Sequence, residues 1–221
     1  MNESSPPGQR FHEIGELLEA YADTGFAFTD TPESPGPGLA SYLRIVARRP
    51  GRGAVAVQQL DDLLSVGLFS EEIAEDIDGM PEIQPPTGMS VEDCLRISRN
   101  HIHRALQNPS LVPRMNPQNR WEWNERFPAL SQFFGAYLNQ RCLDFHASPE
   151  EAVDDYRDES DPDDVRQSVG EITELLTVVA SDQELEQATD ALGIEVLPPQ
   201  DLTLRQWLEA VRTRLGSGSG R

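Results

Sequence analysis

The chain has 221 residues and a formal net charge of −20, and all 18 of its basic residues are arginines. Such a charge repels phosphate backbones and attracts basic partners over about a Debye length, which argues against direct binding of nucleic acid. No apolar run reaches the roughly 18 residues of a membrane span and no secretory signal opens the chain, so we expect a cytoplasmic protein that does not enter a membrane.

The first half of the chain predicts a helical domain over residues 11–106, after a flexible N-terminus at residues 1–10. In the segment Phe11–Tyr21, apolar residues recur three and four positions apart, as on one face of a helix. Four more helices are expected in this half: one preceded by Pro37, one containing Val57–Leu64, one after Ser70 and one after Ser90.

Residues 107–126 are predicted to be a linker, because the stretch up to Asn119 is rich in proline and asparagine. Trp121 and Trp123 follow at a spacing of two. Two interpretations are open. The tryptophans either staple the linker against one or both hydrophobic cores, or form an aromatic anchor for a partner, since Trp is enriched at interface hot spots.

The second half predicts a helical domain over residues 127–215 and a flexible tail at residues 216–221. Phe127–Tyr137 has one apolar face, and Pro128 suits the first turn of a helix. Gly193 is expected to close a later helix as a C-cap. N-cap signatures mark the starts of four more helices: Ser148-Pro-Glu-Glu151, Asp161-Pro-Asp-Asp164, Ser181-Asp-Gln-Glu184 and Thr203-Leu-Arg-Gln206.

The two halves resemble each other in sequence. Phe11–Tyr21 matches Phe127–Tyr137 at an offset of 116 residues (127 − 11). Other matches follow in the same order at offsets of 112 to 114: Tyr42 with Tyr156, Leu60–Leu64 with Ile172–Leu176, Pro85-Pro86 with Pro198-Pro199, and Met89–Leu95 with Leu202–Leu208. Collinear matches indicate a tandem duplication. We therefore expect an all-α protein of two tandem related helical-bundle domains, with about five helices each, that is a monomer with internal pseudo-symmetry.

The chain carries no recognisable set of catalytic, cofactor-binding or metal-binding residues. His101 and His103 are the histidines closest in sequence, but residues two apart on a helix point to different faces, unlike a helical metal pair. Cys94 and Cys142 lie in apolar patterns and are expected to be buried. We expect no enzyme and no cofactor. The enzymatic alternative is a hydrolase whose site is assembled between the two copies.

Acidic residues are concentrated between Glu150 and Asp164, where Arg157 is the only basic residue. On a helix starting near Pro149, carboxylates three and four positions apart form a strip whose like charges repel by a few tenths of a kcal/mol per pair. The strip is either a solvated face or a face for a basic partner, which would relieve the repulsion. The candidate partner-binding residues are Glu151, Asp154, Asp155, Asp158, Glu159, Asp161, Asp163 and Asp164.

A set of short motifs runs through residues 127–215: Phe127-Pro-x-Leu130-x-x-Phe133-Phe134-Gly135-x-Tyr137, Pro149–Val153, Leu192-Gly193, Pro198, Leu202–Leu208 and Val211-Arg212. Together these motifs resemble the small helical immunity proteins of contact-dependent growth inhibition systems. The first half joins this family only through the internal repeat. An aromatic- and His-containing stretch of the family is replaced here by Asn139–Asp144.

The resemblance implies a cytoplasmic, non-catalytic antidote that binds the C-terminal domain of a polymorphic toxin, often a nuclease, and occludes its active or substrate-binding surface. Nuclease domains are basic because they hold phosphates, so the acidic composition fits a basic toxin domain as partner. The alternative is an acidic non-catalytic scaffold or regulatory adaptor that binds another cytoplasmic protein.

Overall fold

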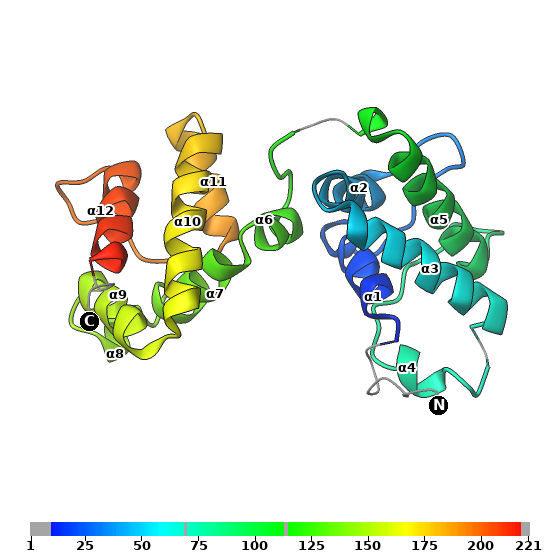
Figure 1. The fold of residues 1–221 in the computed structure, drawn as a ribbon, viewed down its shortest axis with the longest axis horizontal. Helices are drawn as coiled ribbons and strands as arrows, with labels where there is room; N and C mark the ends of the chain where they lie inside the picture. Colours follow the sequence, from blue (N-terminus) through cyan, green and yellow to red (C-terminus); the bar gives the residue numbers. More distant parts are fainter. Residues whose placement is uncertain (1–9, 69, 113–114, 218–221) are drawn as a thin grey trace. The chain divides into compact units, whose positions relative to one another are not determined.

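The structure is a computed structural model that describes residues 10–68, 70–112 and 115–217. Within these residues, the regular elements are helices and the other backbone pairing is one isolated parallel bridge between Ala27 and Gln84, which confirms the all-α prediction (Figure 1). In chain order the elements are α1 (His12–Glu19), η1 (Ala22–Thr24), α2 (Pro37–Arg48), α3 (Pro50–Val66), α4 (Ala74–Ile77), α5 (Val91–Gln107), η2 (Pro109–Leu111), α6 (Arg120–Arg126), α7 (Pro128–Tyr137), α8 (Cys142–Phe145), α9 (Pro149–Glu159), α10 (Pro162–Val178), α11 (Asp182–Ala191) and α12 (Leu204–Gly216).

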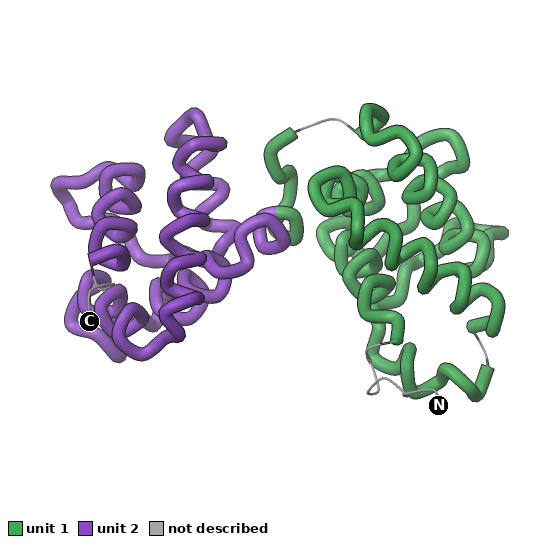
Figure 2. Tube along the Cα trace, viewed as in Figure 1, with its two compact units in different colours: residues 1–122 green, residues 123–221 purple. Residues whose placement is uncertain are grey.

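The chain divides into two compact units, residues 1–122 and residues 123–221 (Figure 2). The division falls inside α6, a short helix within the segment that the sequence predicts as a linker. Each unit has its own hydrophobic core. Apart from Arg10, Gly216 and Ser217, the predicted flexible ends lie outside the described residues.

Helices of the second unit begin at the predicted caps. The side chains of Ser148, Asp161, Ser181 and Thr203 each accept a hydrogen bond from a backbone N–H in the first turn of α9, α10, α11 and α12. These bonds satisfy N–H groups that have no partner inside the helix. Pro128 lies in the first turn of α7. The five predicted helices are therefore found, and α8 is an additional short turn of helix.

The apolar face of α7 builds the core of the second unit. Phe127, Leu130, Phe133 and Phe134 are fully buried, and the Phe133 ring stacks on Tyr156 of α9 with 4.2 Å between centroids. α7 packs against α9 and α10, and α12 packs against α9, α10 and α11. Burying one such aromatic side chain stabilises the fold by about 1.5–3 kcal/mol.

A glycine brings the connection after α11 onto α7. Gly193 has a φ of +97°, the conformation that the predicted C-cap requires. A Cβ atom at Gly193 would lie only 3.2 Å from the Cα of Gly135 in α7. Two residues later, the Glu195 N–H donates to the Leu138 carbonyl at 2.9 Å. The two sequence motifs that contain Gly135 and Gly193 are therefore in contact in the folded unit.

The helices α1, α2, α3 and α5 of the first unit pack in the same pattern as α7, α9, α10 and α12 of the second. α3 packs against α1, α2 and α5, as α10 packs against α7, α9 and α12. In each unit, one side chain of a long helix (α3 or α10) accepts at least one hydrogen bond from a backbone N–H group of an earlier helix (α1 or α7). Gln59 of α3 accepts hydrogen bonds from the Glu13 and Ile14 N–H groups at 3.0 and 3.2 Å. Glu171 of α10, 112 residues later (171 − 59), accepts from the Leu130 N–H at 3.0 Å.

The two tryptophans at the division belong to different cores. Trp121 stacks on Tyr42 with 6.2 Å between centroids and packs against the core of the first unit. Trp123 is buried in the core of the second unit and stacks on Phe127 at 5.8 Å. This packing confirms the staple interpretation, with one tryptophan for each core.

Candidate functional site

The described residues hold no cluster of metal-binding side chains, that is, no group of three or more His, Cys, Asp or Glu that could hold a metal ion. No described helix has the length and apolar content needed to cross a membrane. Cys94 and Cys142 are buried free thiols, as predicted. Burial raises the pKa of Cys94 to about 11, which disfavours the reactive thiolate. The candidate site is therefore a surface.

Helix α9 carries the predicted acidic strip because its two faces differ. Ala152, Val153 and Tyr156 are buried against the core, which turns the carboxylates between them outward. The Tyr156 hydroxyl shares a hydrogen bond of 2.9 Å with Ser168 of α10, which gives the buried phenol a partner. The orientation of the strip is thus set by the buried face of the same helix.

The centre of the strip is neutralised within the unit. Asp154 accepts hydrogen bonds from Arg214 Nε of α12 at 2.7 Å and from Arg157 Nη1 at 2.9 Å. The bond from Arg214 is the main reason that the pKa of Asp154 lies below its ordinary value. Arg157 also donates to Asp158 at 2.8 Å. Repulsion along the strip is therefore offset here, and Asp154 links α9 to α12.

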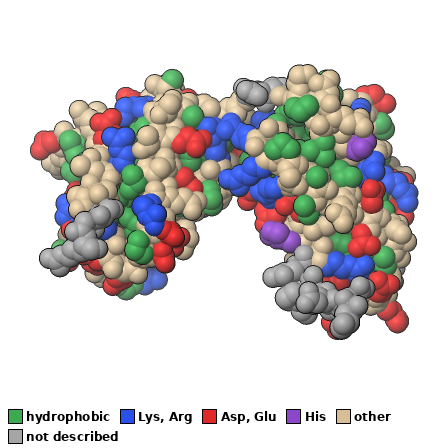
Figure 3. Space-filling view, viewed as in Figure 1, with side chains coloured by type: hydrophobic (Ala, Val, Ile, Leu, Met, Phe, Trp, Pro, Cys, Tyr) green, Lys and Arg blue, Asp and Glu red, His purple; other side chains and the backbone are tan. Residues whose placement is uncertain are grey.

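The other predicted residues divide into those with a partner and those without. The partnered residues are Glu151 (with the Ala147 N–H), Asp155 (with His146 Nδ1, 3.0 Å), Asp161 (with the Asp163 N–H, 2.8 Å) and Asp163 (also with Arg166). Glu159 and Asp164 are exposed and form no hydrogen bond or ion pair with any described residue. On the face of the second unit seen in Figure 3, acidic and arginine side chains are interspersed.

Two exposed apolar side chains lie next to the strip, and the sequence analysis missed both. Leu143 and Phe145 of α8 are 64% and 69% exposed, whereas Cys142 in the same turn is buried. The Arg141 guanidinium lies 5.0 Å from the centroid of the Phe145 ring. An exposed aromatic residue among charged groups is typical of a protein-binding hot spot. The available signal was the stretch Asn139–Asp144, which departs from the immunity-protein pattern, contains Leu143 and ends just before Phe145.

Two contacts of α9 hold the end of α8. Asp155 binds His146, the residue after Phe145, and Glu151 binds the N–H of Ala147. The apolar residues of α8 therefore lie beside the carboxylates of α9. We call Leu143, Phe145, Glu151, Asp155 and Asp158 together the α8–α9 surface.

The second unit also matches a known family. Residues 126–215 match the model of the CdiI immunity protein family. This match confirms the resemblance seen in the motifs of the second half, and it spans α7 to α12, including the α8–α9 surface. It supports, in general terms, a toxin-neutralising immunity protein. No curated protein and no solved structure matches the chain.

The first unit lies outside the CdiI match, and the segment that follows its first helix differs from α8. Phe28, in the corresponding stretch, is buried and stacks on Tyr21 at 6.0 Å. Its N–H donates to the Gln84 carbonyl at 3.0 Å, and the Gln84 N–H donates to the Phe26 carbonyl at 2.7 Å. The segment around Gln84 therefore pairs with the backbone next to Phe28 in the first unit.

The ion pair between Asp154 and Arg214 gives a pH-dependent prediction. We expect Asp154→Asn to lower the free energy of unfolding by about 1 kcal/mol at pH 7, a small value because both side chains are partly exposed. The folded-state pKa is lowered, so the stabilisation is present above the ordinary value of 3.8 and is lost as the pH falls through the folded-state pKa.

Urea titrations of the unaltered chain and of Asp154→Asn between pH 7 and pH 2.5 measure this loss of stability. Glu159→Gln is the control, because Glu159 is exposed and forms no ion pair with a described residue. A difference between Asp154→Asn and the unaltered chain that does not decrease as the pH falls would contradict the assignment.

Proposed function

We propose that the chain neutralises the C-terminal domain of a cognate polymorphic toxin by binding it in the cytoplasm through the α8–α9 surface. Binding occludes the active or substrate-binding surface of the toxin and needs no catalysis. The observation that carries the proposal is the CdiI match over residues 126–215, within which Phe145 is exposed beside carboxylates. Aromatic residues at the centre of an interface and charged residues at its rim are the usual arrangement of a protein–protein contact.

The charge of the chain supports a basic nuclease domain as the partner. Residues 123–221 contain 8 arginines and 20 acidic residues, a net charge of −12 (8 − 20). A nuclease must be basic where it holds phosphates. An acidic immunity protein is attracted to that same surface, which raises the association rate, while Leu143 and Phe145 supply apolar contact area.

We further propose that the first unit is a divergent tandem copy of the second. Support comes from the shared order and packing of the helices and from the shared hydrogen-bonding role of Gln59 and Glu171. The two copies form a monomer with internal pseudo-symmetry, and only the second keeps an exposed α8.

The test is protection together with direct binding. A toxin gene adjacent to this one is expressed with and without the full chain, and the purified toxin domain is titrated with the chain by calorimetry. We expect survival of cells and tight binding. We expect Phe145→Ala to weaken binding about 30-fold, as loss of a hot spot of about 2 kcal/mol does.

Leu111→Ala is the matched control, because Leu111 is 62% exposed but belongs to the first unit and is not part of the α8–α9 surface. The affinity of Leu111→Ala for the toxin domain should equal that of the unaltered chain. Absence of both protection and binding would overturn the proposal. Binding of another cellular protein without protection would favour the scaffold or adaptor alternative.

A further inference from the structure

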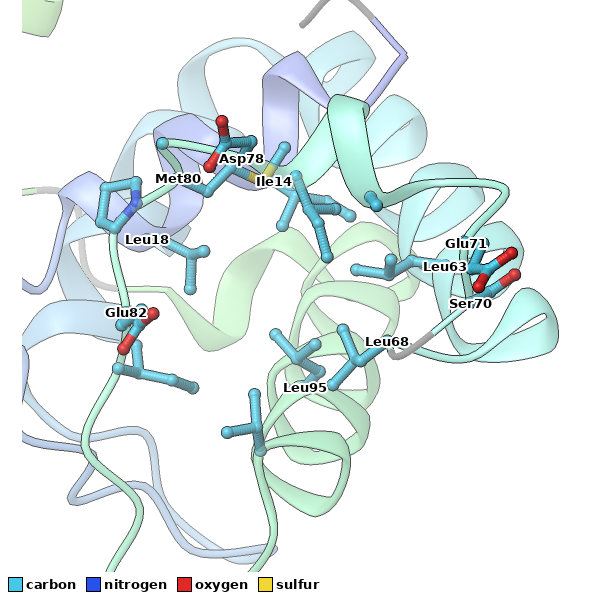
Figure 4. Close-up of a pocket in the computed structure, with 16 residues that line it drawn as sticks. Ile14, Leu18, Leu63, Leu68, Ser70, Glu71, Asp78, Met80, Glu82 and Leu95 are labelled. Carbon is cyan, nitrogen blue, oxygen red and sulfur yellow. The ribbon is translucent and has the colours of Figure 1, made fainter.

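A cavity of about 590 Å³ opens in the first unit, between α1, the end of α3, α4 and the start of α5. Its apolar lining includes Ile14, Leu18, Leu63, Leu68, Ile83 and Leu95. In Figure 4, Leu18, Leu68 and Leu95 reach toward the same space from α1, from the turn after α3 and from α5. A cavity of this size accommodates one or two apolar side chains of a partner or a small ligand.

The cavity is present because the fourth helix of this unit is short. In the second unit, α11 has 10 residues and places Leu185 and Ala188 in the core. In the first unit, α4 has 4 residues, and the chain after it turns at Gly79, where φ is +79°. The shortened helix therefore leaves a recess beside α1, α3 and α5, and the recess is lined by the core residues Ile14, Leu18, Leu63 and Leu95, which are at most 8% exposed.

The wall of the cavity is strongly acidic. Between Asp61 and Glu82 the sequence has eight acidic residues and no basic one. Four of the eight pair with an arginine: Asp62, Glu72 and Asp76 with Arg10, and Asp61 with Arg99. The cavity is lined by three others, Glu71, Asp78 and Glu82, which are exposed and whose carboxylates form no hydrogen bond or ion pair with a described residue. Figure 4 places these three around the edge of the apolar lining.

An apolar floor and an acidic edge select one kind of occupant. A second copy of this chain is disfavoured, because its net charge of −20 repels the edge. A neutral apolar ligand would bring no charge to the three carboxylates. A polypeptide segment with leucine-sized side chains between arginines or lysines satisfies both parts of the cavity, since its apolar groups are buried while its cations meet the edge.

We propose that this cavity is a second docking site, which takes an apolar side chain flanked by basic residues from the toxin domain. That the segment belongs to the toxin rests on the proposed function; the chemistry of the occupant rests on the cavity alone. The two units then contribute different contacts to one partner: the second offers protruding side chains and the first offers a recess. Contacts at both units raise the affinity above that of either one.

The carboxylates are tested first, in the full chain. The triple variant Glu71→Gln, Asp78→Asn, Glu82→Gln should weaken binding of the toxin domain at low salt at least about fivefold. The control is Glu19→Gln, Asp23→Asn, Glu33→Gln, which removes the same charge from exposed acidic residues that do not line the cavity. Equal effects of the two triple variants would overturn the proposal.

A second variant closes the cavity without truncating the core. Ala74 is exposed and lines the cavity, so Ala74→Trp should fill it and abolish its contribution to binding, with the unfolding midpoint unchanged or raised. Ala54→Trp is the matched control, because Ala54 is exposed on α3 and does not line the cavity. Full binding by Ala74→Trp would contradict the proposal.

A peptide probe separates this proposal from the proposed function. A fluorescent peptide of alternating arginine and leucine should bind the full chain with a dissociation constant below about 1 mM. Peptides with glutamate for arginine or alanine for leucine should not bind, and Ala74→Trp should abolish binding of the first peptide. If the first peptide fails to bind, or binds Ala74→Trp equally well, the cavity site is wrong whatever the toxin experiments give. If the peptide binds the chain as expected but the toxin domain does not bind, the proposed function is wrong and the assigned chemistry of the cavity remains supported.

Discussion

Phe133→Ala should lower the free energy of unfolding of the second unit by about 3–5 kcal/mol, the range measured for truncating a buried phenylalanine. Phe133 is fully buried at the centre of α7. Its ring lies 4.2 Å from the Tyr156 ring and 5.3 Å from the Phe134 ring, centroid to centroid. Removal of the ring takes apolar area out of the core, abolishes both aromatic contacts and leaves a cavity that tightly packed helices close only in part.

Urea unfolding followed by circular dichroism measures this loss. Leu143→Ala is the control, because Leu143 is in the same unit but is 64% exposed; its change should stay within about 0.5 kcal/mol. A loss below about 1 kcal/mol for Phe133→Ala would contradict the description of α7 as the centre of the core.

Glu122→Ala should destabilise the first unit by about 3–5 kcal/mol, because it leaves a mostly buried arginine without its counter-charge. The Arg44 Nε donates to Glu122 Oε2 at 2.9 Å, and the two side chains are 14% and 2% exposed. The Glu122 N–H donates in turn to the Asn119 side chain at 2.9 Å. Thermal unfolding monitored by calorimetry provides the measurement.

A double variant separates the cost of an unpaired charge from the value of the pair. Arg44→Met with Glu122→Leu removes both charges and keeps similar volumes, so we expect it to recover most of the loss seen in Glu122→Ala. The surface variant Arg10→Gln, which breaks ion pairs of a partly exposed arginine, should cost about 1 kcal/mol or less. A double variant as unstable as Glu122→Ala would show that Arg44 and Glu122 do not act as a pair.

The helices were predictable because their signals are local. Ser148 lies three residues before the Glu151 N–H that it caps, and Thr203 lies three residues before Gln206, so each cap can be read from one short stretch. The buried face of α7 follows in the same way from residues three and four positions apart. Helix α8 has four residues and no side-chain cap, so no comparable pattern marked it.

The candidate site was predictable only in part. The sequence places the carboxylates of α9 on one helix, but Arg214, which neutralises Asp154, comes 60 residues later. The exposure of Phe145 could not be predicted from the sequence either. An aromatic residue follows a core helix in both units, but it is buried in the first unit, at Phe28, and exposed in the second, at Phe145. The cavity depends on four elements that meet, one of which is the shortened helix α4, and no single segment carries that information.

Composition, caps and periodicity were therefore sufficient to establish an all-helical chain, the positions of its main helices and its acidic character, since each depends on residues close together in sequence. The pairing of charges, the exposure of α8 and the recess in the first unit depend on which side chains meet after the helices pack. Those contacts join residues tens of positions apart, and their free energies become defined only in the folded units.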